Sequence, residues 1–502
     1  MMMARRIFIR SAADAAPVPG RRRRARLLAH EMGALLRLAV PIAVGQLGSI
    51  AMHTTDTLMV GPLGPHALAA AGLGNALYMA LLISVSGVLS GIAPLVSQSH
   101  GAGDEPEARR AAVQGLWLAL LLSLPVTALS VFGRPLSLAL GQEAGVAAMG
   151  GGFMLALAPG VVPTLLFAVL KYYLDALGRP RVAMWVTFVG VAVNVIGNRI
   201  FIYGVPGVVR PLGVVGSGLS TTLVRWAMLG VIAVYVARHP ELSPFRGARL
   251  RPDGERLRRI GRIGGPIGAQ LGAEIGTFSV AAVMMGWMGP AQLAAHQVTL
   301  NLASATFMIA VGAAIAGSIR VGRAVGAGSR RGVHRAVLAA YGVTSAFMAL
   351  TAASFLLFPR FLLELYTHDA EILRYGTGLL LMAGLFQLFD GAQVAGISLL
   401  RGAADTRVPM LITLLGYWGI GIPVAYWLGF HTELRHVGVW AGLTLSLAVV
   451  ALLLLWRVRL VLWRRPVVAV VARPAGLTQR RGDAERAAAP LRVSVALREV
   501  EQ

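Results

Sequence analysis

The stretch GPHALAAAG at residues 64–72 recurs later in the chain as GPAQLAAHQ at residues 289–297. The Gly-Pro pair and the Leu-Ala-Ala triplet stand at the same places in both copies, at an offset of 225 residues. Three further pairs match at this offset or one residue beyond it: Gly101-Ala102-Gly103 with Gly326-Ala327-Gly328, Pro41-Ile42 with Pro266-Ile267, and Arg181-Val182 with Arg407-Val408. Four matches in register predict that the chain consists of two homologous halves.

Both halves consist mainly of apolar segments. Of the 502 residues 56% are apolar and only 14% are charged, and the mean hydropathy is +0.69. Because ~20 apolar helical residues cross a bilayer, we predict twelve transmembrane helices, at 34–60, 66–99, 109–132, 146–170, 181–203, 211–237, 263–289, 293–322, 333–358, 371–399, 408–429 and 438–463. The composition excludes an ordinary soluble enzyme. The lack of cysteine excludes disulfides and thiol nucleophiles.

The predicted fold is therefore an all-α polytopic membrane protein with two parallel six-helix repeats. Six is an even number, so both repeats have the same orientation and are related by a pseudo-twofold axis along the membrane normal. The predicted organisation is an Arg-rich tail at 1–30, an N-lobe at 31–238, a basic linker at 239–262, a C-lobe at 263–464 and a second tail at 465–502. Parallel repeats place a shared cavity between the lobes, which suits a transporter but also a channel.

The net charge of +24 belongs to loops and tails rather than to a nucleic-acid-binding domain. With the N-terminus in the cytoplasm, the inner loops carry seventeen arginines and the outer loops four. By the positive-inside rule both termini are cytoplasmic. We expect the inner membrane of a bacterium and no nucleic-acid partner. The Arg-rich start also resembles a mitochondrial transit peptide, but four consecutive arginines break an amphipathic face and favour a cytoplasmic tail.

Three acidic residues fall deep inside predicted spans: Glu274, Asp390 and Asp56. Ionisable groups are costly in a membrane, so each is a functional candidate. Desolvation favours the protonated form of a carboxylate, and the ionised form can bind Na⁺ or an organic cation. Mutually exclusive binding of a coupling ion and a cationic substrate is the requirement for an antiporter. The alternative is a carboxylate that is neutralised by arginine and only holds helices together.

The first half offers specific partners for Asp56. Arg225 and Arg199 lie in neighbouring spans, so an ion pair between Asp56 and either arginine is one hypothesis. Asn194 and Asn198 are spaced i, i+4 and face the same way. Together with Thr221 they form either a packing contact or a polar network around Asp56.

The seventh span carries a glycine stripe at Gly264, Gly268, Gly272 and Gly276. Small residues at this spacing predict a close helix contact. Glu274 lies about 160° around the helix from Gly272 and should point away from that contact. His53 and His296 do not stand at a metal-ligand spacing.

Several motifs, taken together and in their order along the chain, are specific enough to indicate a protein family. They are Asp56 to Gly61 (DTLMVG), Asn194 to Gly204 (NVIGNRIFIYG), Leu293 to Gln297 (LAAHQ), Arg320-Val321-Gly322 before Gly326-Ala327-Gly328, Asp390 with Gln393, Leu400-Arg401-Gly402 and Asp405, and Tyr417-Trp418 with Pro423. The combination resembles the multidrug and toxic compound extrusion (MATE) transporters, specifically their NorM-like branch, from about Met32 to Arg464.

The resemblance implies efflux of cationic lipophilic compounds in exchange for Na⁺ or H⁺. It places a cation site, with Na⁺ as one candidate ion, at Glu274, Asn301 and Asp390, and a proton- or cation-responsive network at Asp56, Asn194, Asn198 and Thr221. One departure is Phe386, where relatives can carry tyrosine. We expect a monomer without cofactor or enzymatic activity, whose partners are small cationic drugs or metabolites and the lipid bilayer.

Two other functions are weaker alternatives. A lipid-linked oligosaccharide flippase of the same superfamily would need a cationic cavity to hold pyrophosphate, whereas Glu274 and Asp390 favour positive cargo. An intramembrane enzyme would need a second aspartate at the depth of Asp390, and the twofold repeat has no role in that chemistry.

Overall fold

Helices make up the fold of residues 21–247 and 250–464, the part of the chain that this computed structural model describes. The first half contains α1 (Arg21–Val60), η2 (Gly61–Leu63), α2 (Pro65–Leu89), α3 (Ile92–Ala102), α4 (Glu105–Val131), α5 (Gly133–Ala139), α6 (Ala144–Leu157), η3 (Ala158–Gly160), α7 (Val161–Ala176), α8 (Pro180–Tyr203) and α9 (Gly213–Arg238). The second half contains α10 (Gly254–Met288), α11 (Pro290–Gly326), α12 (Arg330–Leu357), α13 (Pro359–Glu364), α14 (Ala370–Gly402), α15 (Arg407–Leu414), η4 (Leu415–Gly421), α16 (Ile422–Phe430), α17 (Arg435–Val458) and η5 (Arg459–Arg464).

The twelve predicted transmembrane helices are confirmed, since twelve helical segments of the described residues are long and apolar enough to cross a membrane. Several extend past the predicted ends; the fourth, for example, is Ala144–Ala176. α1 begins at Arg21, so its first turns fall within the predicted tail 1–30. Residues 1–20 and the predicted tail at 465–502 lie outside the described residues.

Three spans are interrupted rather than continuous. α2 and α3 form one span with a break at Ser90 and Gly91, α6 and α7 are joined by the 3₁₀ turn η3, and α15 and α16 are joined by the π-helical segment η4. Pro94, Pro159 and Pro423 stand at or just after these breaks, because proline lacks the N–H that a continuing helix needs. The other long helices keep their prolines inside: Pro41, Pro125 and Pro266.

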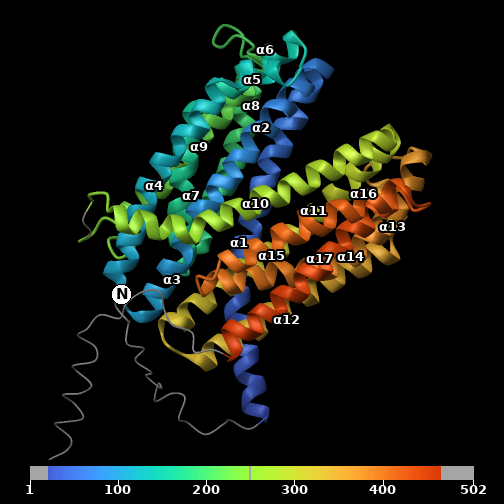
Figure 1. Cartoon of the computed structure of the whole chain (residues 1–502). Coiled ribbons are helices and arrows are strands. Elements are labelled where there is room, and N and C mark those ends of the chain that lie inside the picture. The colour runs from blue at the N-terminus through green and yellow to red at the C-terminus, as the bar shows by residue number, and fades with distance from the viewer. Residues whose placement is uncertain (1–20, 248–249, 465–502) are drawn as a thin grey trace, which may run out of the picture.

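The helices form two bundles, which are called the first and the second lobe below (Figure 1). One apolar core lies mainly in the first bundle, one lies within the second, and one joins α1 to the second bundle. In Figure 1, α5 and α6 of the first bundle lie apart from α13 and α16 of the second. At the other end α3 packs directly on α11. This second end carries the arginine-rich loops and is called the basic end below; α5, α6, α13 and α16 mark the opposite end.

Two long helices connect the lobes. α1 packs on α8 of its own lobe and on α11 of the other, and α10 packs on α2 as well as on α11. Gly264 and Gly268 of α10 lie so close to the backbone of α2 at Val88 and Ser84 that a Cβ atom would not fit. The predicted glycine stripe is therefore a close helix contact, and it lies between the two lobes.

The contacts at the basic end repeat across the pseudo-twofold axis. Gly101 at the end of α3 lies against the backbone of Arg323, and Gly326 at the end of α11 lies against the backbone of Gln98. Gly101 and Gly326, like Gln98 and Arg323, are related by the 225-residue offset. An isologous contact of this kind is what twofold symmetry produces.

Two side chains extend this symmetric contact, and we call them the interlobe caps. Arg323 of α11 donates from Nε and Nη2 to the carbonyl oxygen of Ala176, at 3.2 and 2.8 Å. Gln98 of α3 donates from Nε2 to the carbonyl oxygen of Gly402, at 3.0 Å. Ala176 and Gly402 are the last residues of α7 and α14, where carbonyls have no partner within the helix. Each cap thus donates to the carbonyl group at the C-terminal end of a helix in the opposite lobe.

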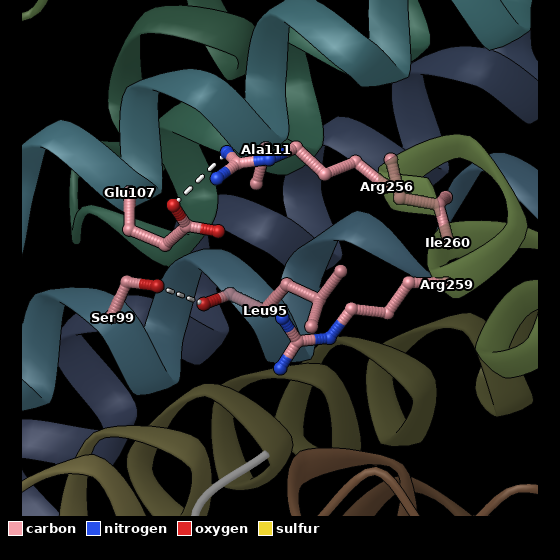
Figure 2. A pocket seen from close by; sticks show the side chains of 7 residues that line it. All are labelled: Leu95, Ser99, Glu107, Ala111, Arg256, Arg259 and Ile260. Atoms are coloured by element: carbon pink, nitrogen blue, oxygen red, sulfur yellow. Dashed lines mark hydrogen bonds and ion pairs between the residues drawn. The ribbon is translucent and has the colours of Figure 1, made fainter. Parts of the chain in front are cut away.

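The linker between the lobes is bound to α4. Gln114 donates to the carbonyl oxygen of Arg251 at 3.0 Å and accepts from the backbone N–H of Asp253 at 2.8 Å, and Trp117 donates to the carbonyl of Leu250 at 2.7 Å. Figure 2 shows the adjoining ion pair between Arg256 of α10 and Glu107 of α4, at 3.0 Å. The start of α10 is therefore fixed to the first lobe.

Candidate functional site

A polar cluster surrounds Asp56 in the first lobe. Its Oδ1 accepts hydrogen bonds from the amide nitrogens of Asn194 at 3.0 Å and Asn198 at 2.7 Å, and its Oδ2 accepts one from the Thr221 hydroxyl at 3.2 Å. The i, i+4 spacing on α8 brings both amides to one carboxylate. Three donors match an ionised carboxylate, which can only accept. The sequence left a packing contact and a polar network as alternatives, and the structure brings all four side chains together as a polar network.

One atom of the cluster is left over. Asn198 is fully buried, and its Oδ1 has no hydrogen-bond partner among the described residues. Its amide nitrogen already donates to Asp56 and, at 3.4 Å, to Asn194. An acceptor beside a carboxylate can receive a proton from the protonated acid or help to coordinate a cation.

The hypothesis of an ion pair at Asp56 is wrong for both Arg199 and Arg225. Arg199 instead stacks over the ring of Tyr203, with its guanidinium carbon 5.5 Å from the ring centre. Arg225 interacts electrostatically with Asp56 but forms no salt bridge within 4.0 Å in residues 21–247 and 250–464. Asn194, Asn198 and Thr221 fill the places around Asp56, so neither arginine makes contact.

Glu274 and Asp390 form the acidic pair of the second lobe. Glu274 lies on α10 and Asp390 on α14, and the two carboxylates are close enough to interact electrostatically. Glu274 is partly buried and Asp390 is 6% exposed. Within the described residues no side chain donates a hydrogen bond to either carboxylate. One buried and one partly buried carboxylate without donors need a proton or a cation to offset their charge.

The π-helical segment η4 lies beside this pair. Tyr417 on η4 interacts electrostatically with both acids, and its hydroxyl donates to Gln393 Oε1 at 2.8 Å. The neighbouring Trp418 donates to the carbonyl oxygen of Ala273 at 3.1 Å and so fixes the backbone next to Glu274. π segments are frequent at functional sites. The sequence identified Tyr417 and Trp418 as family motif residues but not the π segment.

Arg401 is a component of the site that the sequence analysis did not place there. It lies near the end of α14, interacts electrostatically with Glu274, and donates from Nη2 to Gln270 Oε1 at 3.2 Å. The predicted tenth span ended at residue 399, which put Arg401 in a loop; α14 continues to Gly402. Glu274 thus has a cationic neighbour on one side and Asp390 on the other.

The remaining predicted residue of the cation site, Asn301, has a different partner. Asn301 is exposed, and its side-chain oxygen accepts a hydrogen bond from the Tyr366 hydroxyl at 2.8 Å. Phe386, one turn before Asp390, packs edge-on against Phe278 and Trp440. Trp440 also donates to Nδ1 of the buried His296 at 3.0 Å. Phe386 and His296 therefore belong to an aromatic core behind the acidic pair.

A buried ion pair in the first lobe was also missed. Lys171 Nζ and Asp175 Oδ2 lie 3.1 Å apart on α7, and Asp175 is 3% exposed. Lys171 is the only lysine in the chain, and its i, i+4 spacing to Asp175 could have indicated the pair. The predicted fourth span ended at 170, so both residues were assigned to a loop.

The two lobes, twelve spans and buried carboxylates define a polytopic membrane transporter. The chain belongs to the MatE family, whose pattern matches residues 41–200 and 266–427. It is 37% identical to a protein of Mesorhizobium japonicum named "Probable multidrug resistance protein NorM", covering 85% of this chain and 93% of that one. A protein of the same name from Burkholderia mallei is 38% identical, covering 84% and 91%. These relatives confirm the resemblance to MATE transporters of the NorM-like branch.

Solved structures show the same fold. The eukaryotic MATE transporter AtDTX14 superposes with a TM-score of 0.79 at 22% identity, covering 88% of this chain and 98% of that one. A structure described as the outward-facing conformation of a multidrug resistance MATE family transporter gives a TM-score of 0.77 at 22% identity, covering 86% and 96%. As a member of this family, the chain is a transporter and not an enzyme.

Proposed function

We propose that this protein is a multidrug efflux antiporter, which exports cationic lipophilic compounds in exchange for Na⁺ or H⁺. The relatives named as multidrug resistance proteins support the efflux of drugs. The acidic pair Glu274 and Asp390 carries the rest of the proposal. One buried and one partly buried carboxylate without hydrogen-bond donors bind a proton, Na⁺ or an organic cation through the same charge. The same pair counts against the lipid-linked oligosaccharide flippase, whose cargo is anionic.

The coupling follows from competition at this pair. When the coupling ion binds Glu274 and Asp390, it neutralises the charge that would hold a cationic compound, so the compound leaves. Arg401 repels a second cation from the side of the basic end. Exchange of one H⁺ or Na⁺ for a compound of charge +1 moves no net charge, so the concentration gradient of the coupling ion supplies the driving force. Each tenfold gradient of that ion releases about 1.4 kcal/mol, which supports a tenfold gradient of the compound.

The cluster at Asp56 supplies a second ion-responsive group. A proton on Asp56 would turn one acceptor into a donor, and Asn198 Oδ1 is the acceptor at hand. To meet it, the Asn198 amide must rotate and withdraw its nitrogen from Asp56. This rearrangement changes the contact between α1 and α8 in the first lobe, apart from the acidic pair of the second.

The arrangement of the lobes supports alternating access. The lobes are in contact at the basic end and lie apart at the opposite end (Figure 1). By the positive-inside rule the basic end faces the cytoplasm. The described conformation is then open to the outside, both termini are cytoplasmic, and the membrane is the bacterial inner membrane. We infer a monomer that needs no cofactor beyond its coupling ion.

Transport by purified protein in liposomes tests the proposal. Ethidium movement is followed while Na⁺ and pH gradients are imposed one at a time. We expect transport driven by one of them, and a loss of at least about tenfold in Glu274→Gln and in Asp390→Asn. Glu364→Gln is the matched control, because Glu364 pairs with Arg360 on an exposed short helix. Ethidium transport that ignores both gradients, or variants as active as wild type, would overturn the antiporter.

A further inference from the structure

A cavity of about 520 Å³ lies between the lobes at the basic end. Its walls come from α1, from the turn between α7 and α8, from α8 and α9 of the first lobe, and from α11 of the second. Five of the twelve lining residues are arginines and none is acidic: Arg37, Arg179, Arg181, Arg320 and Arg323. The cavity is separate from the acidic pair and plays no part in the proposed exchange of cations.

Only two of these arginines have a partner in the described residues. Arg320 forms a bidentate ion pair with Glu31, with both nitrogen–oxygen distances at 2.7 Å. Arg323 is the interlobe cap on Ala176. Arg37, Arg179 and Arg181 are exposed, and residues 21–247 and 250–464 offer them no hydrogen-bond or ion-pair partner. Three uncompensated guanidinium groups therefore converge on one cavity.

The chemistry of the lining defines the ligand. Guanidinium groups form bidentate hydrogen bonds with phosphate, and three of them compensate the charge of one phosphate group or more. Ala34, Leu38, Leu177 and Val182 supply an apolar part of the wall. Ligands of drug size occupy pockets of roughly 300–1,000 Å³, so the cavity is too large for a single inorganic ion and has room for a whole lipid headgroup.

From these observations we propose that the cavity binds the phosphate-bearing headgroup of an anionic phospholipid from the leaflet at the basic end. Basic pockets between transmembrane helices are suited to such headgroups. The phosphate lies between Arg37, Arg179 and Arg181, and the glycerol and first acyl carbons lie on the apolar wall. The second lobe contributes only Arg320 and Arg323 to the wall, so the bound lipid reaches that lobe through these two cations, next to the Arg323 cap. It therefore stabilises the conformation that is closed at the basic end.

The test uses the full chain in detergent with phosphatidylcholine, to which phosphatidylglycerol or inorganic phosphate is added. Native mass spectrometry measures lipid binding, and the thermal unfolding midpoint measures stabilisation. The variant is Arg179→Gln/Arg181→Gln. Its matched control, Arg134→Gln/Arg210→Gln, removes the same charge from exposed residues at the opposite end.

We expect phosphatidylglycerol to bind and stabilise wild type and the control alike. One arginine near an anionic surface changes affinity about fivefold, so the double variant should bind about 30-fold more weakly. Arg37→Gln, an exposed single change, should weaken binding about fivefold and keeps the test open if the double variant does not fold. Equal binding by variant and control overturns the site. Equal stabilisation by inorganic phosphate overturns the lipid as its ligand.

Discussion

Replacing Arg323 by leucine, which has no hydrogen-bond donor, removes one interlobe cap and should shift the equilibrium between the two conformations of the transporter. Arg323 donates twice to the carbonyl oxygen of Ala176, and this bond exists only while the basic end is closed. A hydrogen bond from a charged group contributes about 1.5–3 kcal/mol. Its loss should lower the ratio of closed to open basic ends about 10- to 150-fold. The symmetry-related cap at Gln98 is neutral and should contribute less.

Distance measurements between spin labels can follow this shift, because the chain contains no cysteine that would interfere. Gln142→Cys, between α5 and α6, and His368→Cys, between α13 and α14, place one exposed label on each lobe at the opposite end. Wild type should show mainly the long distance of separated lobes. Arg323→Leu should show a larger population at short distance.

The matched control is Arg330→Leu. Arg330 also donates to a backbone carbonyl, that of Trp463 at 2.7 Å, but both residues belong to the second lobe. This variant should keep the wild-type distance distribution. If Arg323→Leu also keeps it, or if both variants shift equally, the bond between Arg323 and Ala176 does not hold the basic end closed.

Three further predictions concern other contacts. Gly264→Ala forces a Cβ atom into the Val88 backbone at a cost of about 1–3 kcal/mol. The same spin labels should therefore report fewer molecules with separated lobes. The control Gly261→Ala, with open space around it, should not differ from wild type. Lys171→Met leaves Asp175 without its partner and should lower the free energy of unfolding in denaturant by about 3–5 kcal/mol. Lys171→Met/Asp175→Leu should recover most of this lost stability. A double variant no more stable than the single one would contradict a buried ion pair. Gln114→Leu removes two hydrogen bonds to the linker, together about 1–3 kcal/mol, and should speed tryptic cleavage between residues 246 and 259; an unchanged rate would show that the linker is held by other contacts.

The spans and the repeat could be predicted because both are one-dimensional patterns. Apolar length identified twelve helices, and the offset of 225 residues related Gly101 to Gly326 before their contact was known. The i, i+4 spacing also showed that Asn194 and Asn198 face the same way, but it left open whether they only pack or contact Asp56. Periodicity did not predict which side chains contact the carboxylate of Asp56. Arg199 was a plausible partner by depth, but it stacks on Tyr203.

The missed parts of the site have a common cause, since each depends on where a helix ends. Charged residues end an apolar pattern, so Arg401 and the pair Lys171 and Asp175 were assigned to loops although α14 and α7 continue through them. The π segment at Tyr417 depends on a tertiary contact as well, because Ser446 donates to the carbonyl of Gly416 at 2.7 Å. Hydropathy predicts neither that a helix continues through a charged residue nor that one of its turns contains an extra residue.

The binding of the linker to α4 restricts how the lobes can move. Because Gln114 and Trp117 hold the linker and Glu107 holds Arg256, the first turns of α10 travel with the first lobe, although the rest of the helix belongs to the second. A change of conformation must then be accommodated within α10 itself. Pro266, between the closely packed Gly264 and Gly268, is the place where this helix lacks a backbone N–H. We therefore expect α10 to bend near Pro266 when the lobes move, rather than to move as one rigid helix.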